Sequence, residues 1–124
     1  MNVVDSSGWL EYFADGPNAA FFARAIEATR ELLVPTLGLY EVFKRVLQQR
    51  GTDQALQAIA LMQQGRVVDL TAPLALSAAT TSFERRLPMA DSIMLATARL
   101  HGATLWTQDS DFQGIEGVKY LAKR

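Results

Sequence analysis

The stretch Pro88-Met-Ala-Asp-Ser-Ile-Met-Leu-Ala-Thr-Ala-Arg-Leu-His-Gly-Ala-Thr-Leu-Trp-Thr-Gln-Asp109 contains the signals of a helix, a stop and a strand in direct succession. Proline favours the first position of a helix, and Gly102 is typical of the end of one. Residues 103–106 then form a short apolar run, as a strand buried on both faces does. The helix is expected to bury the apolar side chains that recur at i, i+4, i+7 and i+11, which are Met89, Ile93, Ala96 and Leu100.

The same alternation of strand and helix runs through the rest of the chain. Further short apolar runs predict strands at 2–4, 32–34, 66–70 and 118–121. Helical patterns predict helices at 8–13, 18–30, 36–50, 52–64 and from Thr71 onward. Strands that alternate with helices indicate a parallel sheet covered on both faces. The sequence therefore predicts an α/β fold with a five-stranded parallel sheet.

The bulk properties describe an ordinary globular chain. The 124 residues are 49% apolar and 20% charged, which fits a single domain spanning 1–124 with a real core. There is no cysteine, which excludes disulfides and thiolate metal sites and fits a reducing cytosol. The N-terminus shows no signal-peptide pattern, and no apolar run approaches the roughly 20 residues of a membrane span. A cytoplasmic protein without membrane contact is expected.

Four acidic residues lie where a strand ends or where the following helix begins. They are Asp5, Glu41, Asp91 and Asp109. In an open parallel sheet these positions converge on one crevice, where such folds bind their ligands. Carboxylates about 4 Å apart repel by ~4 kcal/mol at a surface-like dielectric, and a divalent cation would neutralise them. Hard oxygen ligands favour Mg²⁺ or Mn²⁺.

Each acid also has an ordinary structural interpretation. Asp5 suits a helix N-cap, Asp91 suits the first turn of a helix, and Asp109 with Asp111 suits an Asx-turn. Glu41 lies too deep in its helix for an effect of the helix dipole, which fades within the first turn. The shared location at the carboxyl ends of strands favours a joint site over four separate roles.

Other functional classes find little support. Neither G-x-G-x-x-G nor G-x-x-x-x-G-K-[ST] occurs where a nucleotide site requires it, and the lone His101 suits a structural role at a helix end. The net charge is −1, but thirteen acids less the four site carboxylates leave nine against twelve Lys and Arg, a balance of +3. The charge count is therefore compatible with an RNA partner and does not establish one.

Four segments together resemble the PIN-domain family, most closely the VapC-type toxins. They are Val3-Val-Asp5-Ser-Ser, Glu41 within Leu-Tyr-Glu-Val-Phe, Leu87-Pro-Met-Ala-Asp91-Ser-Ile-Met-Leu-Ala-Thr-Ala, and Leu105-Trp-Thr107-Gln-Asp109-Ser-Asp111-Phe112. The resemblance covers essentially the whole chain and implies a three-layer α/β/α sandwich. It also implies Mg²⁺- or Mn²⁺-dependent cleavage of RNA, a homodimer, and a cognate antitoxin whose tail lies across the active site.

The resemblance assigns roles to these residues by position. The family's four acids fall on Asp5, Glu41, Asp91 and Asp109, with Asp5, Asp91 and Asp109 as metal ligands. Glu41 and Asp109 can also act through water. Ser6 and Thr107 fall on supporting polar positions, and Asp111 supplements or replaces Asp109, a choice that the sequence leaves open.

Two alternatives remain at this stage. A non-catalytic binding module would share the fold, although it would not need all four acids. A receiver-type signalling domain also has a parallel sheet and an acidic Mg²⁺ pocket. It requires an acidic pair after the first strand, where this chain has Asp5-Ser-Ser, and a Lys after the fourth strand, where none follows Trp106.

Overall fold

Five strands form one parallel sheet in the computed structural model, which describes residues 1–124. They are β1 (Asn2–Val4), β2 (Leu32–Pro35), β3 (Arg66–Val68), β4 (Thr104–Thr107) and β5 (Val118–Tyr120). Their order across the sheet is β3-β2-β1-β4-β5, and every neighbouring pair is parallel. The direction of winding therefore reverses between β1 and β4. Receiver domains use the order 2-1-3-4-5 instead, so the sheet excludes that alternative.

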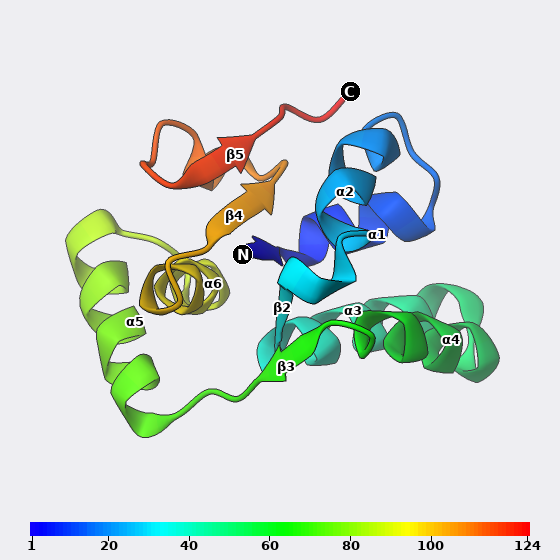
Figure 1. Ribbon diagram of the computed structural model, residues 1–124, viewed down its shortest axis with the longest axis horizontal. Helices are drawn as coiled ribbons and strands as arrows, with labels where there is room; N and C mark the ends of the chain where they lie inside the picture. The colour runs from blue at the N-terminus through cyan, green and yellow to red at the C-terminus, as the bar shows by residue number, and fades with distance from the viewer.

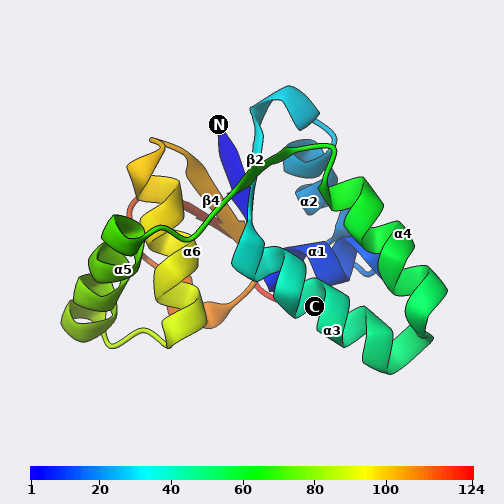
Figure 2. The same cartoon turned by 90° about the horizontal axis from the view of Figure 1, so that it is seen from below.

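Six α-helices cover the two faces of this sheet (Figures 1 and 2). One face carries α1 (Ser6–Phe13), α2 (Ala19–Ile26), α3 (Thr36–Arg50) and α4 (Thr52–Met62), and the other carries α5 (Ala72–Arg85) and α6 (Met89–Leu100). This arrangement confirms the predicted three-layer α/β/α sandwich. None of the helices combines the length and apolar character that a membrane-spanning segment needs.

Alternation along the strands divides the core in two. Successive side chains of a strand point to opposite faces, so Val4, Val34 and Trp106 join the core beneath α1–α4. Val3, Leu33 and Leu105 join the core beneath α6. The inner strand β2 is buried throughout and reads as an apolar run, whereas the edge strands β3 and β5 carry Arg66 and Lys119 and are partly exposed. Burial of each apolar side chain of the core contributes about 1.5–3 kcal/mol.

Two local predictions were wrong. The helix predicted to continue to Arg30 ends at Ile26, and Thr29–Glu31 forms a short 3-10 helix. Ala28 leaves the helical region with ψ near 65°, which redirects the chain so that Leu32 can pair beside Asn2 in the sheet.

The apolar face predicted for the helix at 89–100 was wrong at both of its ends. Met89 and Leu100 are 72% and 66% exposed, whereas every residue from Ser92 to Ala98 is buried. The central turns of α6 lie between the sheet and α5 and are covered from two sides. Met89 and Leu100 lie in the first and last turns, where their side chains are left exposed.

Candidate metal centre

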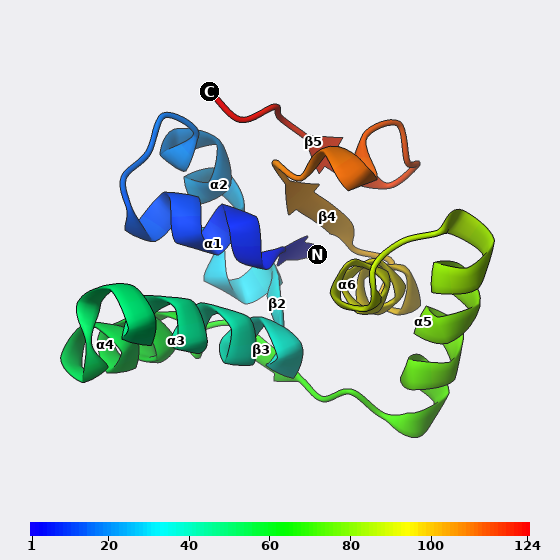
Figure 3. The same ribbon diagram turned by 180° about the vertical axis from the view of Figure 1, so that it is seen from behind.

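The site is built where β1 and β4 end side by side. The backbone N–H of Asp5 donates a hydrogen bond to the carbonyl of Trp106 at 3.1 Å, so the strand ends are tied together one residue beyond the β1 ladder. Asp5 is then the N-cap of α1. Figure 3 shows β1 next to β4, with α1 beginning at the end of β1. This is the point where the winding of the sheet reverses, and ligands of such sheets bind there.

Hydrogen bonds hold Asp5 in a single orientation. Its Oδ1 accepts from the Ser7 hydroxyl at 2.7 Å and from the Gly8 amide at 3.0 Å, and its Oδ2 accepts from the Thr107 hydroxyl at 2.6 Å. A carboxylate has about four lone-pair sites, so one site on Oδ2 stays free. Burial raises the pKa of Asp5 against the opposing effect of these three donors. Asp5 is therefore a rigid carboxylate that can still offer one oxygen lone pair.

Three further carboxylates gather beside this strand end. One oxygen each from Asp91, Asp109 and Asp111 lies within 4.8 Å of the other two. Asp91 comes from the first turn of α6, and Asp109 caps the short 3-10 helix Ser110–Phe112 by accepting from the Asp111 amide at 3.0 Å. The predicted convergence of Asp91 and Asp109 is therefore observed, and Asp111 joins them as a member of the same cluster.

Thr107 links Asp5 to that cluster. Its buried hydroxyl donates to Asp5 and accepts from the backbone N–H of Asp109 at 2.9 Å. A single hydroxyl thus uses its donor on one acid and one acceptor site on the next. Thr107 therefore couples the position of Asp109 to the position of Asp5.

The electrostatics of the cluster fit a divalent cation. The pKa of Asp91 is raised to about 7, first by burial, then by the charge of Asp109, and then by a side-chain hydrogen bond with Asp111 and the charges of Asp111 and Asp5. Part of this rise comes from neighbouring carboxylates, and a bound cation would offset that repulsion. Hard carboxylate oxygens suit Mg²⁺ or Mn²⁺, so the residues present fit the metal that the sequence predicts.

Glu41 makes a separate contact on the neighbouring helix. It lies in the second turn of α3 and accepts a hydrogen bond from the Ser6 hydroxyl at 2.6 Å. The structure thus pairs the predicted acid Glu41 with the predicted polar residue Ser6, outside the cluster of three aspartates. Because Ser6 follows Asp5 directly, this pair still lies at the end of β1.

Ser7 and Gly8 were missed as site residues. Both donate to Asp5, and the signal available was the N-cap itself, because a capping side chain accepts from the amide two or three residues on. Gly8 is also required by packing. A Cβ on Gly8 would lie 2.5 Å from a ring atom of Phe22 and 2.7 Å from a methyl group of Val4.

The raised pKa of Asp91 predicts how stability depends on pH in the absence of metal. Between pH 4 and pH 7 the folded protein holds a proton on Asp91 that the unfolded chain has released, because the folded pKa is about 7. Stability must therefore fall as pH rises through this range. We expect the melting temperature in EDTA to fall from pH 5 to pH 8, and Asp91→Asn to reduce that fall. An unchanged pH profile in the variant would show that Asp91 titrates normally.

Comparison with known proteins places this geometry in a family. The model of the PIN domain matches residues 3–118, and the comparison with curated proteins found no match. A toxin–antitoxin complex from Klebsiella pneumoniae is similar in structure, with a TM-score of 0.82 and 23% identity over 96% of each chain. The Mycobacterium tuberculosis toxin VapC20, described as cleaving the sarcin–ricin loop, has a TM-score of 0.77 and 22% identity, covering 94% of this chain and 95% of its own.

A third similar structure is DNA-bound VapBC from Salmonella typhimurium, with a TM-score of 0.76 and 12% identity, covering 98% of this chain and 97% of the other. These structures share the fold over nearly the full length of both chains. Together with the family match across 3–118, the parallel sheet and the acids at the ends of β1 and β4 lead to one assignment. The chain belongs to the PIN domain family.

Proposed function

We propose that residues 1–124 act as one PIN-like nuclease domain, a Mg²⁺- or Mn²⁺-dependent endoribonuclease that is the toxin of a VapBC-type toxin–antitoxin pair. The observation that carries this proposal is the convergence of Asp91, Asp109 and Asp111, with oxygens within 4.8 Å of one another, beside the buried Asp5. Membership of the PIN family and the likeness to toxin–antitoxin structures support it.

The carboxylates of Asp91, Asp109 and Asp111 would hold the metal, and Asp5 would offer its remaining lone pair. A metal bound there would polarise a phosphoryl oxygen of the RNA and lower the pKa of a bound water. Glu41, held by Ser6, would orient the attacking water. In-line attack on phosphorus would break the P–O3′ bond and leave a 5′-phosphate and a 3′-hydroxyl. In this scheme Thr107, which is hydrogen-bonded to both residues, fixes the position of Asp109 relative to Asp5.

The partners follow from the same proposal. The neighbours from K. pneumoniae and S. typhimurium are toxin–antitoxin complexes, which supports an antitoxin as the partner of this chain. A homodimer is proposed as well, because α5 exposes two large apolar side chains, Leu76 at 71% and Phe83 at 87%. A cytoplasmic location is proposed as part of the same assignment.

A paired assay of metal binding and RNA cleavage tests the proposal. Mn²⁺ should raise the melting temperature, because a ligand that binds only the folded state stabilises it by about 2.7 kcal/mol at 100 times its dissociation constant. Asp5→Asn should weaken this response. Purified protein should cleave RNA internally with Mg²⁺ or Mn²⁺ and stop in EDTA, as seen on a denaturing gel. A melting temperature indifferent to millimolar Mn²⁺, without cleavage, would refute the metal-dependent nuclease.

A further inference from the structure

The side-chain amides of Asn18 and Gln108 form a buried contact next to the turn that carries Asp109. Asn18 is only 1% exposed, and its Nδ2 donates to Oε1 of Gln108 at 3.0 Å and to the carbonyl of Ala122 at 3.0 Å. Its Oδ1 accepts no hydrogen bond. Asn18 therefore contributes two N–H donors, and both are directed at acceptors far away in the sequence.

Gln108 stands between two residues of the site. Thr107 donates to Asp5, and the amide of Asp109 donates to Thr107. Because successive side chains of extended chain leave on opposite sides, Gln108 points away from Thr107. It reaches Asn18 and, over 3.4 Å, the carbonyl of Ser7. The turn that carries Asp109 is thus anchored on the side that faces away from the carboxylates.

Asn18 joins three segments that are otherwise separate. Its backbone N–H donates to Glu11 at 2.7 Å, which fixes the turn between α1 and α2. Its side chain holds Gln108 after β4 and Ala122 in the C-terminal segment. The amide of Leu121 donates to the carbonyl of Thr107 at 3.1 Å, so this last segment also lies along the end of β4.

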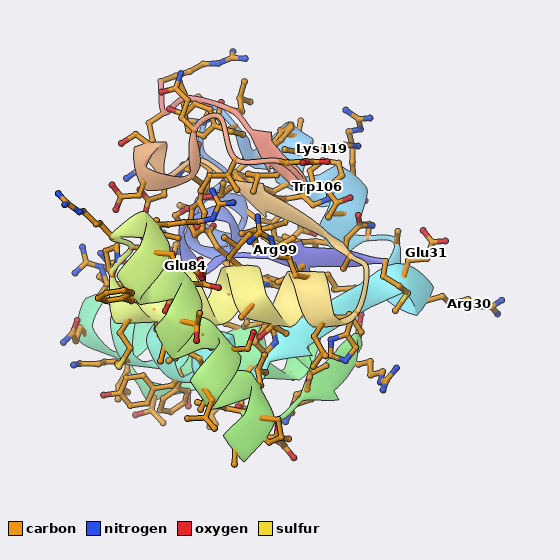
Figure 4. The ribbon with its side chains drawn as sticks, turned by 90° about the vertical axis from the view of Figure 1, so that its left-hand side faces the viewer. Arg30, Glu31, Glu84, Arg99, Trp106 and Lys119 are labelled. Atoms are coloured by element: carbon orange, nitrogen blue, oxygen red, sulfur yellow. The ribbon has the colours of Figure 1, made fainter.

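The neighbouring strand adds a different contact to β4. Lys119 of β5 lies with its ammonium group 4.5 Å from the centre of the Trp106 ring (Figure 4). That contact covers the Trp106 ring. On the side of the turn at 107–109 that faces away from the carboxylates, the side-chain hydrogen bonds of the turn are those of Gln108 with Asn18 and Ser7.

We propose that Asn18 and Gln108 are positioning residues for the metal centre. Their hydrogen bonds fix the turn at 107–109 and thereby set where Asp109 lies relative to Asp5 and Asp91. The part that concerns the metal rests on the proposed function. Residues that orient ligands without touching the metal characteristically change its affinity when replaced.

Asn18→Asp tests this directly, because it keeps the size of the side chain and removes both N–H donors. Hydrogen exchange should become faster at the amides of Asp109, Phe112 and Leu121, whose bonds depend on the turn. The Mn²⁺ concentration at half-maximal change in melting temperature should rise about tenfold. Gln108→Ala provides a second route should Asn18→Asp fail to fold, and it should give the same two changes.

Ala58→Gly is the matched control, since Ala58 is buried in α4 and that helix carries no site residue. It should lower the melting temperature without changing exchange at 107–112 or the Mn²⁺ midpoint. Unchanged exchange at Asp109 in both test variants would overturn the proposal. So would an equal shift of the Mn²⁺ midpoint in Ala58→Gly. If wild type neither binds Mn²⁺ nor cleaves RNA, the proposed function fails, and the exchange data alone decide whether the two residues position the turn.

Discussion

Asp91→Asn should lower RNA cleavage at least about a hundredfold, which corresponds to ~2.7 kcal/mol in the barrier, and should leave the protein folded. The pKa of Asp91 is about 7, raised by burial and by Asp109 and Asp111. The amide is nearly isosteric, so packing at the start of α6 is preserved. It removes one of the charges that would hold the cation and also relieves repulsion in the metal-free protein. Cleavage rates at saturating Mn²⁺, with melting curves in EDTA, measure both effects.

The matched control is Asp53→Asn. Asp53 is the acid in the first turn of α4, as Asp91 is in the first turn of α6, but it is exposed and outside the cluster. It should cleave RNA at the wild-type rate. If Asp91→Asn retained wild-type cleavage, or if it unfolded while Asp53→Asn did not, Asp91 would have to be reassigned to a structural role.

Thr107→Val should reduce both stability and cleavage. The side chain is fully buried, donates to Asp5 at 2.6 Å and accepts from the amide of Asp109 at 2.9 Å. Valine has the same shape and offers neither interaction, so a buried carboxylate loses a donor and a backbone N–H loses its acceptor. Hydrogen bonds to charged groups contribute about 1.5–3 kcal/mol, and a loss of about 2–3 kcal/mol in the free energy of unfolding is expected. Cleavage should fall at least about tenfold.

Thr107→Ser separates the hydroxyl from the packing. Serine keeps both hydrogen bonds and loses only a methyl group, which costs about 0.8 kcal/mol. Denaturant unfolding and cleavage rates of the two variants should therefore differ clearly, with serine close to wild type in activity. Equal losses in both variants would mean that the methyl group, and not the hydroxyl, is what the site needs.

The sequence alone determined the layered architecture. Short apolar runs such as 103–106, separated by helical patterns, indicate buried strands, and this alternation favours a parallel sheet with helices on each side. The same rule placed Asp5 and Asp109 at one edge, because the carboxyl ends of parallel strands share an edge. Local patterns suffice here since strand and helix periods are properties of neighbouring residues.

Only the tertiary structure decided which side chains meet. The sequence could not choose between Asp109 and Asp111, because the turn Ser110–Phe112 determines their directions, and it brings both to Asp91. The exposure of Met89 and the burial of Asn18 depend on which elements pack against them. The periodicity of apolar residues along the sequence does not contain that information. The bond from Asn18 to Gln108 spans 90 residues. Contacts of that range exist only once the sheet has assembled, since they join groups with no local relation.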